Sequence, residues 1–418
     1  MENKNKIPQI RFKGYTNDWE QCVLGEASEV YDGTHQTPRY TDSGVMFLSV
    51  ENIETLKSEK YISEKDFTKD FSIYPKKGDV LMTRIGDIGT ANVVENDDPK
   101  AYYVSLALLK PKVVDSYFLK EAISSETVKA DLWQRTLHIA FPKKINKNEI
   151  SKVKILYPDI KEQKAIGKFL KNIDSSITLH QRKCEKLKLF KKSMLGKMFP
   201  KNGEKVPEVR FEGFTDDWEQ CEFDKFFDMN IPTNTLSRSK LNDFVGGIRN
   251  VHYGDVLIKY GSVLDVKGQH IPYITNGNIE KYRSQLLKDG DVIIADTAED
   301  ETAGKVVEIS NSEGSNVVAG LHTYACRPLK TMSKYYLGYY MNSDSYHEQL
   351  LTLLQGTKVL SLSKKNLATT EIKYPVNRDE QFKIGSFFKD LDSSITLHQR
   401  KVEKLQEIKK SMLDKMFI

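Results

Sequence analysis

An internal duplication constrains this chain more than any other feature of its sequence. Residues 8–22 read PQIRFKGYTNDWEQC and residues 207–221 read PEVRFEGFTDDWEQC, with ten of fifteen positions identical. A second pair is stronger: residues 162–199 and 380–417 align without a gap and share 27 of 38 positions, including an unbroken DSSITLHQRK. A repeat of this kind predicts that one structural plan is built twice.

The order of the repeats predicts two homologous halves, each a globular module followed by a helical region. We place the first module at residues 1–160, its helix at 161–200, the second module at 201–378 and its helix at 379–418. Between the matched ends the modules agree only at scattered points, such as Gly-Asp-Val at residues 78–80 and 290–292. We interpret this as a shared scaffold with different loops, which should bind two different things of one kind.

Both helical segments carry apolar residues at steps of three and four, the pattern of a coiled-coil seam. If the helices pack antiparallel, the seam histidines of the two segments should meet near the centre; we expect them to be structural rather than metal ligands or catalytic groups. Gly167 and Gly385 weaken the first turns, so we expect the helices to begin slightly later. The predicted seam residues are Ile166, Leu170, Ile173, Ile177, His180 and Leu187, and Ile384, Phe388, Leu391, Ile395, His398 and Leu405.

Composition and missing motifs narrow the functional classes. No apolar run among the 418 residues approaches the ~20 that a membrane helix needs, and Met1 to Ile7 lacks the apolar stretch of a signal peptide, so we expect a cytoplasmic protein with no membrane partner. Four scattered cysteines indicate reduced thiols. Phosphate-binding glycine motifs, the zinc-protease motif and the Asn/Asp-Pro-Pro-aromatic motif of amino-methylating DNA enzymes are missing. We therefore expect no catalytic residue, metal site or cofactor in this chain.

The charge is unevenly distributed along the chain. The net charge is +5, of which the first helical repeat contributes +7 and the second +2, so the remaining residues sum to −4. Because phosphate neutralisation supplies much of the non-specific affinity for DNA, the globular modules should not bind DNA strongly by themselves. Tight binding is expected to need other subunits.

The duplicated order of motifs resembles one family. The motifs are Arg11-Phe12-x-Gly-Tyr15 with Trp19, Arg210-Phe211-x-Gly-Phe214 with Trp218, the two Gly-Asp-Val turns, a Tyr-Pro before each helix, and the Glu-Gln pairs at residues 162–163 and 380–381. In this order they are similar to the specificity subunit of a type I restriction-modification system. The resemblance spans essentially the entire chain, and its specificity lies in the duplication rather than in any single motif.

The resemblance implies a function without an active site. Each module would be a target recognition domain that reads one half of a split DNA sequence, and the helices would set the gap. Two methyltransferase subunits, which bring S-adenosylmethionine, would dock on the helices and recognition domains. Restriction subunits, the ATP- and Mg-dependent motor-nucleases, would join them. The assembled complex would be a site-specific DNA methyltransferase and an ATP-dependent endonuclease.

Duplex DNA favours a particular arrangement of two similar modules. Its local two-fold axes lie perpendicular to its length, so a matching pseudo-two-fold in the protein is favourable, and this requires antiparallel helices. We therefore predict an α+β fold with two mixed α/β target recognition domains, each followed by a long helix, and an antiparallel coiled coil with pseudo-two-fold symmetry. The half-sites should differ and lie roughly 10 bp apart, centre to centre.

Base reading needs side chains that donate or accept hydrogen bonds in a groove. We select loop residues of these types in both modules, although each one taken singly is also explained as an exposed loop residue. The tyrosines at 335, 336, 339 and 340 have helical spacing, which predicts buried core rather than a base-stacking platform. The candidate DNA-binding residues are Thr34, His35, Gln36, Arg39, Arg84, Lys143, Lys144 and Lys147, and Asn276, Asn278, Thr357, Lys358, Lys364 and Lys365.

Two other functions remain open from the residues alone. The chain could be a coiled-coil scaffold whose globular modules bind proteins rather than DNA, in which case duplex binding would not depend on sequence. It could also be a stand-alone endonuclease with an unrecognised site, in which case the purified chain would cleave DNA with a metal ion.

Overall fold

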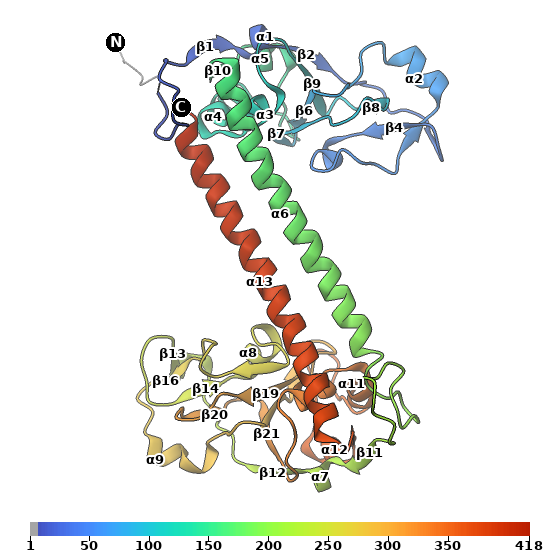
Figure 1. Ribbon diagram of the computed structural model, residues 1–418, viewed down its shortest axis with the longest axis vertical. Coiled ribbons are helices and arrows are strands. Elements are labelled where there is room, and N and C mark those ends of the chain that lie inside the picture. Colours follow the sequence, from blue (N-terminus) through green and yellow to red (C-terminus); the bar gives the residue numbers. More distant parts are fainter. Residues whose placement is uncertain (1–6) are drawn as a thin grey trace. The chain divides into compact units, whose positions relative to one another are not determined.

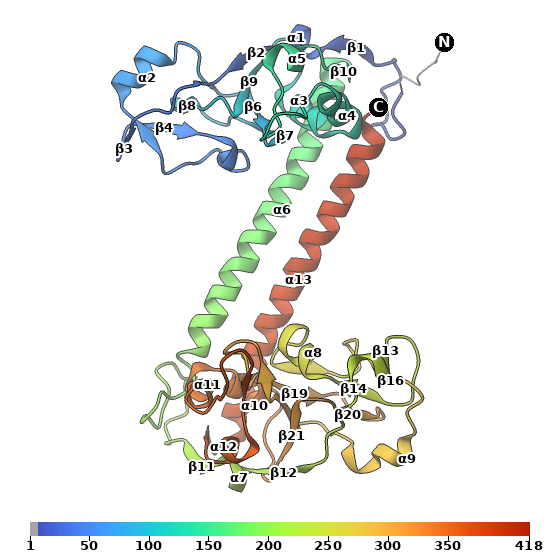
Figure 2. The ribbon, with the colours of Figure 1, turned by 180° about the vertical axis from the view of Figure 1, so that it is seen from behind.

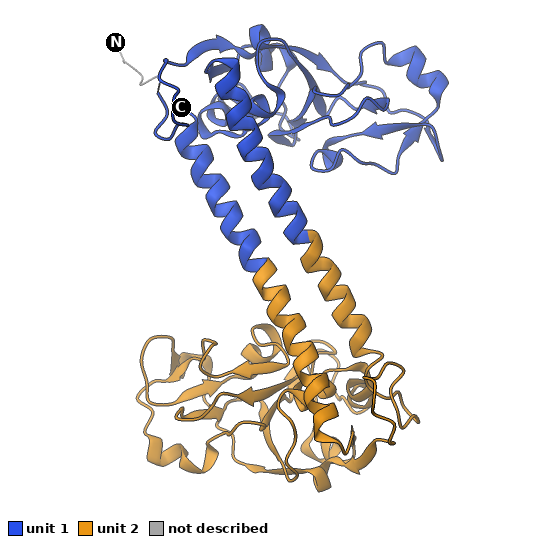
Figure 3. Ribbon diagram, viewed as in Figure 1, with its two compact units in different colours: residues 1–181, 399–418 blue, residues 182–398 orange. Residues whose placement is uncertain are grey.

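The computed structural model describes residues 7–418, which form two compact units. Unit 1 contains the chain up to residue 181 together with residues 399–418, and unit 2 contains residues 182–398 (Figure 3). The long helices are α6 (Ile160–Leu195) and α13 (Arg378–Met416) (Figure 1). The units divide each helix near its middle, whereas the domain bounds predicted from the sequence separate helices from modules. Each unit therefore holds one globular module and part of both helices.

The first module is built on two sheets. β1 pairs antiparallel with β10, which brings the beginning of the module to its end, where α6 starts. The main sheet has the order β2-β9-β6-β7 and the smaller sheet the order β3-β5-β4-β8. The strands are β1 (Glu20–Val23), β2 (Ser28–Asp32), β3 (Tyr40–Thr41), β4 (Val45–Leu48), β5 (Tyr61–Ile62), β6 (Val80–Ile85), β7 (Asp87–Val93), β8 (Lys100–Tyr102), β9 (Leu106–Pro111) and β10 (Lys154–Tyr157). The helices are α1 (Leu24–Ala27), η1 (Val50–Asn52), α2 (Glu64–Asp70), α3 (Ser116–Ser124), α4 (Glu126–Gln134) and α5 (Lys147–Ser151).

The main sheet of this module separates two cores. Successive side chains of a strand point to opposite faces. Val80 and Met82 of β6 therefore enter one cluster with residues of α3, α4 and α5, while Leu81 enters a second cluster with the smaller sheet. Figures 1 and 2 show the smaller sheet and α2 at the side of the module away from α6.

The second module repeats this plan. β11 pairs with β23 as β1 does with β10, and the smaller sheet again contains one parallel pair, β14 with β20, matching β4 with β8. The main sheet, β12-β21-β17-β19-β15, has one strand more, and β15 runs parallel to β19. The strands are β11 (Glu219–Glu222), β12 (Phe227–Ile231), β13 (Leu241–Asn242), β14 (Arg249–Val251), β15 (Val263–Asp265), β16 (Tyr273–Ile274), β17 (Val292–Ala295), β18 (Thr297–Ala298), β19 (Val306–Ser310), β20 (Val317–Ala319), β21 (Thr323–Pro328), β22 (Leu360–Ser361) and β23 (Glu371–Tyr374). The helices are α7 (Phe223–Phe226), η2 (Arg238–Lys240), α8 (Tyr253–Ile258), α9 (Ile279–Tyr282), η3 (Arg283–Gln285), α10 (Tyr336–Met341), α11 (Asp344–Leu351) and α12 (Lys364–Ala368).

The duplicated Arg-Phe motif fastens each module to the helix that follows it. Arg11 donates two hydrogen bonds of 2.7 Å to the carboxylate of Glu162 in the first turn of α6. Arg210 makes the same bidentate pair with Glu380 of α13, at 2.7 and 2.9 Å. Both glutamates are buried, so each pair joins two distant segments inside the protein. The Glu-Gln sequence is thus explained by packing.

The duplicated tryptophans are core residues. Trp19 contacts Phe118 and Phe417, with ring centroids 5.7 and 6.0 Å apart. Trp218 contacts Phe199 and Tyr336 in unit 2, at 6.3 and 6.0 Å. In each unit the phenylalanine that follows the end of a long helix therefore completes the aromatic cluster beneath the module. The predicted burial of the tyrosines is confirmed at 336, 339 and 340, whereas Tyr335, which precedes α10, is only half-buried.

The expectation that Gly167 and Gly385 delay the helix starts was wrong. Both lie inside helices that begin seven residues earlier, at Ile160 and Arg378. A Cβ at Gly167 would lie 2.8 Å from the backbone nitrogen of Phe118, and one at Gly385 would lie 2.6 Å from a backbone carbonyl oxygen. These glycines let the helix approach the module closely, and this packing outweighs their weak helix propensity.

Within each unit the two helix segments run antiparallel, as predicted. In unit 1 the last turns of α13 lie beside the first turns of α6, and in unit 2 the end of α6 lies beside the first part of α13 (Figures 1 and 2). Lys409 pairs with Asp174 in unit 1, and Lys191 pairs with Asp392 in unit 2, both at 2.6 Å. The repeat therefore places the same ion pair in both units.

Candidate nucleic-acid interface

The first group of candidates follows β2 in the first module. His35, Gln36 and Arg39 are exposed, while Thr34 is half-buried. Thr34 donates its backbone N–H to the carbonyl oxygen of Tyr102 at 3.1 Å, and its own carbonyl oxygen accepts from Val104 at 2.9 Å. The segment is thus fixed to the end of β8 at one point and presents polar side chains to solvent beyond it.

Arg84 occupies a different environment from the other candidates. Its side chain is only 5% exposed, its guanidinium pairs with Asp32, and its Nε donates to the carbonyl oxygen of Ile145 at 3.0 Å. A base contact by Arg84 would require this ion pair to open. Asp32 was missed by sequence reasoning, because the two residues lie 52 positions apart and only the pairing of β2 with β9 and of β9 with β6 brings them together.

Arg84 also helps to place the lysine candidates. Ile145 donates its N–H to the carbonyl oxygen of Arg84 at 3.0 Å, and Gly86 donates to the carbonyl oxygen of Lys143 at 2.8 Å. Exposed Lys143 and Lys144 therefore lie beside the end of β6, and exposed Lys147 begins α5 just beyond. The structure brings these four candidates into one region.

The second module presents a comparable loop. Thr357 and Lys358 are exposed between α11 and α12, and Leu362 donates its N–H to the carbonyl oxygen of Asp296 at 2.8 Å, just after β17. Lys364 and Lys365 are exposed in the first turn of α12. This attachment corresponds to that of the lysine loop on β6, so the two loops occupy equivalent places in their modules.

The asparagine candidates lie on another part of the second module. Asn276 and Asn278 are exposed in the loop that joins β16 of the smaller sheet to α9. Asn276 has a left-handed backbone with φ of 55°, and the side chain of Asn278 caps α9 by accepting from the N–H of Glu280 at 3.0 Å. The loop that carries Asn276 and Asn278 is therefore separate, in sequence and in sheet, from the loop that carries Thr357.

The predicted seam residues are buried to different degrees. In unit 1, Ile166, Leu170 and Ile173 share a buried cluster with Met416 and Phe417. In unit 2, Ile384, Phe388 and Ile395 are buried. The meeting of the two histidines stays a prediction. The half-buried seam positions are Ile177, His180, Leu187, Leu391, His398 and Leu405.

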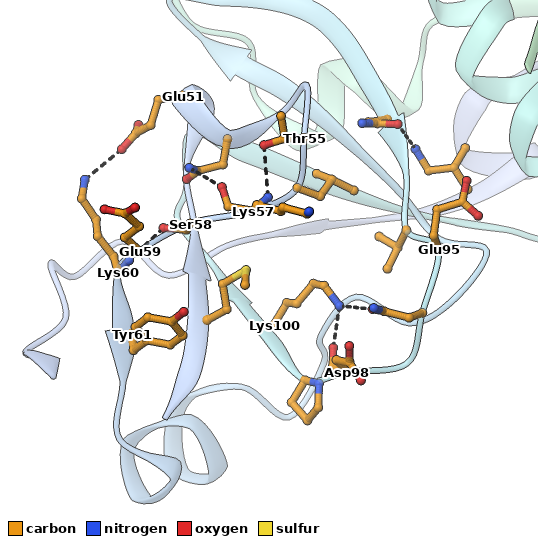
Figure 4. Close-up of a pocket in the computed structure, with 18 residues that line it drawn as sticks. Glu51, Thr55, Lys57, Ser58, Glu59, Lys60, Tyr61, Glu95, Asp98 and Lys100 are labelled. Carbon is orange, nitrogen blue, oxygen red and sulfur yellow. Dashed lines mark hydrogen bonds and ion pairs between the residues drawn. The ribbon is translucent and has the colours of Figure 1, made fainter. Parts of the chain in front are cut away.

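A hollow of about 1100 Å³ in the first module was not anticipated from the sequence (Figure 4). At its edge Lys60 pairs with Glu51 at 2.8 Å, and this contact, with a hydrogen bond from Ser49, lowers the pKa of Glu51 to about 2. Lys100 is buried, donates to the carbonyl oxygen of Asp98 at 2.8 Å, and has a pKa lowered by burial. Acids and lysines alternate around the hollow, so it lacks the uniformly positive lining of a phosphate-binding groove.

Residues 7–418 offer neither a cluster of metal-binding side chains nor a helix that could span a membrane. Over that part of the chain, no three side chains of His, Cys, Asp or Glu gather as a metal site. No helix within the same range combines the length and the apolar character needed to cross a bilayer.

Comparison with known proteins identifies the family of this chain. A model of the type I restriction modification DNA specificity domain matches the chain twice, at residues 16–189 and 216–407. The chain belongs to this family. Each match covers one module and most of the helix that follows it, in agreement with the internal repeat. The resemblance stated from the sequence motifs is thereby confirmed.

Curated relatives and a solved structure agree with the assignment. The type I restriction enzyme MjaVIII specificity subunit of Methanocaldococcus jannaschii is 22% identical over 73% of this chain and 70% of its own length. The putative MjaX specificity subunit of the same organism is 22% identical over 95% of this chain and 92% of its own. The crystal structure of a type I restriction-modification S subunit from M. genitalium has a TM-score of 0.65 at 12% identity, with 99% of both chains covered, so the fold is shared. The chain is a type I specificity subunit whose role is DNA recognition.

Proposed function

We propose that each module of this specificity subunit reads one half of an asymmetric bipartite DNA target and that α6 and α13 set the spacer. One observation carries the proposal. The two modules share one frame, meaning the sheets and the Arg–Glu pairs described above, and carry chemically different loops at the same place on it. The loop at 137–144 and the loop at 354–361 are both tied to the strand that follows a Gly-Asp-Val turn. Different side chains on one frame are what two different half-sites require.

Identical exposed residues on the two long helices favour the docking of two copies of one partner. The decapeptides at 174–183 and 392–401 are identical. Packing explains identity at buried positions, but Leu179 and Leu397 are also identical and are 51% and 53% exposed. Exposed apolar residues in a repeated setting favour the same protein surface bound twice. We assign this role to two methyltransferase subunits.

The partners would supply what this chain does not carry. The methyltransferase subunits would bring S-adenosylmethionine, and the restriction subunits would bring ATP- and Mg-dependent translocation and cleavage. The specificity subunit itself would remain non-catalytic within a cytoplasmic complex that methylates and cleaves DNA. The charge sum of −4 outside the helical repeats supports a need for the partners in tight DNA binding.

A module swap tests the division of labour. The subunit, purified with its methyltransferase partner, should methylate one bipartite sequence. Replacing residues 201–378 with the second module of another specificity subunit should change one half of that sequence and leave the other half intact. Methylation that ignores the swap would contradict the proposal. Duplex binding without sequence preference, even with partners present, would instead favour a protein-binding scaffold.

Helix length tests the spacer function separately. Inserting one heptad into both α6 and α13 adds ~10 Å, equivalent to about 3 bp of duplex. The preferred gap between the half-sites should lengthen by that amount, measured by sequencing the methylated sites. A gap that stays fixed while both half-sites are still read would refute the spacer function without touching the recognition function.

A further inference from the structure

The loop between α4 and α5 of the first module has an apolar tip that nothing in its unit covers. Ile139 and Phe141 are 99% and 103% exposed, as in an extended chain. Leu137 and Trp133 at the base of the loop are also exposed. Large apolar side chains at full exposure gain nothing from folding, so an apolar tip of this kind indicates a binding surface.

The base of this loop is held firmly. Leu137 donates its N–H to the carbonyl oxygen of Lys144 at 2.8 Å, which closes the loop, and Gly86 ties Lys143 to the end of β6. The ammonium of Lys143 lies 4.3 Å from the centre of the Trp133 ring. The tip is therefore projected from a braced base, which lowers the ordering cost of binding.

The charge around the tip matches a polyanion. From residue 133 to residue 148 the sequence contains four cations and no acid. Arg135 is already paired with Asp131 and Glu149, whereas Lys143, Lys144 and Lys147 are exposed beside the tip. A duplex presents phosphates for such lysines and stacked bases for the apolar side chains between them.

The equivalent loop of the second module shows that the fold does not require an apolar tip. Its tip carries exposed Gln355, Gly356, Thr357 and Lys358, and its one large exposed apolar side chain, Val359, is 50% exposed. Both loops are closed by a bridge, Leu137 with Lys144 in one and Gln355 with Ser361 in the other. At this position a fully exposed apolar tip is thus found in the first module, whereas strongly exposed apolar side chains of the second module, such as Phe244 at 92% and Val245 at 77%, lie outside the equivalent loop.

We propose that Ile139 and Phe141 form an apolar wedge that enters the stacked bases of the half-site read by the first module and unstacks one base step, while Lys143 and Lys144 contact the flanking phosphates. This inference rests on the proposed function, since it assumes that the first module binds a half-site. Insertion of apolar side chains between base pairs is a known way to exchange stacking energy for protein contact. The equivalent loop of the second module, with its largely polar tip, forms no such wedge.

The test uses the complete complex of this subunit with its methyltransferase subunits, bound to a duplex that contains the sequence the complex methylates. The fluorescent base 2-aminopurine is placed, one duplex at a time, at positions of both half-sites other than the methylated adenines. Its fluorescence should rise on binding at one step of the first half-site and at no step of the second. The double substitution I139S/F141S should abolish that rise and weaken binding roughly tenfold to a hundredfold, as loss of base–aromatic contacts does.

Control measurements distinguish failure of the wedge from failure of the proposed function. V113S removes an exposed apolar side chain of the same module outside the loop and should leave fluorescence and affinity unchanged. If the unaltered complex binds no sequence selectively, the proposed function has failed. If it binds selectively but no step of the first half-site brightens, or deoxyuridine in place of thymine reproduces the loss, the wedge is refuted in favour of groove contact. Loss of complex assembly by the double variant without DNA would show that the tip binds a protein.

Discussion

The two modules agree where they meet the long helices and differ where they face outward. Arg11 with Glu162 and Arg210 with Glu380 make nearly identical bidentate pairs. Four residues after the valine of each Gly-Asp-Val turn, however, the first module has Arg84 paired with Asp32, whereas the second has Asp296, which lies 3.2 Å from His322. Equivalent backbone positions thus carry opposite charges. The difference teaches that the frame is built for one task performed twice, and the outward side chains for two separate targets.

The start of the helix after the main sheet shows a subtler difference. In the first module Asp115 caps α3 locally, accepting from the N–H groups of Tyr117 and Phe118 at 3.0 and 3.1 Å. In the second, the buried carboxylate of Glu308 comes from β19 and accepts from the N–H groups of Tyr335 and Gly338 at 2.6 and 2.9 Å. The same helix start is therefore satisfied by a neighbour in one module and by a distant strand in the other.

The largest effect should come from the shared frame. Arg11→Met would leave the buried carboxylate of Glu162 without its cation and should cost unit 1 about 3–5 kcal/mol of unfolding free energy. Arg210→Met should cost unit 2 the same, measured by denaturant unfolding followed by hydrogen exchange in each unit. The double variant R11M/E162L, which removes both charges, should recover most of the loss. Strongly unequal single effects would break the equivalence of the two frames.

The aromatic clusters should respond next, and unequally. Phe199 contacts the rings of Trp218, Tyr336, Tyr340 and Phe388, whereas Phe417 contacts the rings of Trp19 and Phe118 among the described residues of unit 1. Phe199→Ala should therefore destabilise unit 2 by about 3–4 kcal/mol, and truncation of Phe417 should destabilise unit 1 by somewhat less. Thermal unfolding of both variants measures the difference. A larger effect at Phe417 would contradict this account of the packing.

Two carboxylates, Glu308 in unit 2 and Asp174 in unit 1, predict opposite dependence on pH. Burial raises the pKa of Glu308 from 4.5 to about 7, so the folded unit retains a proton that the unfolded chain releases. The stability contributed by this group is full below pH 4.5 and is lost as the pH rises to about 7, by about 3 kcal/mol. Unfolding of unit 2 between pH 4 and 8 should show this slope, and Glu308→Gln should flatten it.

In unit 1 the pH slope that Asp174 contributes should have the other sign. Burial alone would raise the pKa of Asp174, but Lys120 and Lys409 outweigh it, and the pKa lies below its ordinary value of 3.8. Stability from this group is therefore present above that value and lost as the pH falls below it. A slope in unit 2 that survives Glu308→Gln would show that another group titrates there.

The smallest effects should come from single lysines of the recognition loops. Lys143→Ala and Lys358→Ala remove exposed side chains, so folding stability should change by less than about 0.5 kcal/mol. If both lysines contact phosphates, each change should reduce the slope of log affinity against log salt by about 1 in the assembled complex. A reduction for one lysine only would identify which loop lies nearer the DNA backbone.

The shared frame could be predicted from the sequence because the repeated segments specify it in both halves. The repeated Trp and the 3.6-residue spacing of Ile166, Leu170 and Ile173 depend on local patterns, and the structure buries all of them. The role of Gly167 was not predictable, because it depends on where α3 packs against the helix. The pairing of Arg84 with Asp32 and the role of Glu308 were missed for the same reason: each side chain finds its partner through strand pairing between distant segments. The base-reading candidates remain predictions, since exposure alone does not identify a contact.

The composition of unit 1 has a consequence for the order of assembly during translation. Residues 182–398 are contiguous, so the second unit has all its parts as soon as residue 398 has left the ribosome. The first unit lacks Met416 and Phe417 until residues 399–418 emerge, on the order of tens of seconds after its own sheets are made. During that interval Trp19 and Phe118 have no cover from the returning segment. The half synthesised first is therefore the half that matures last.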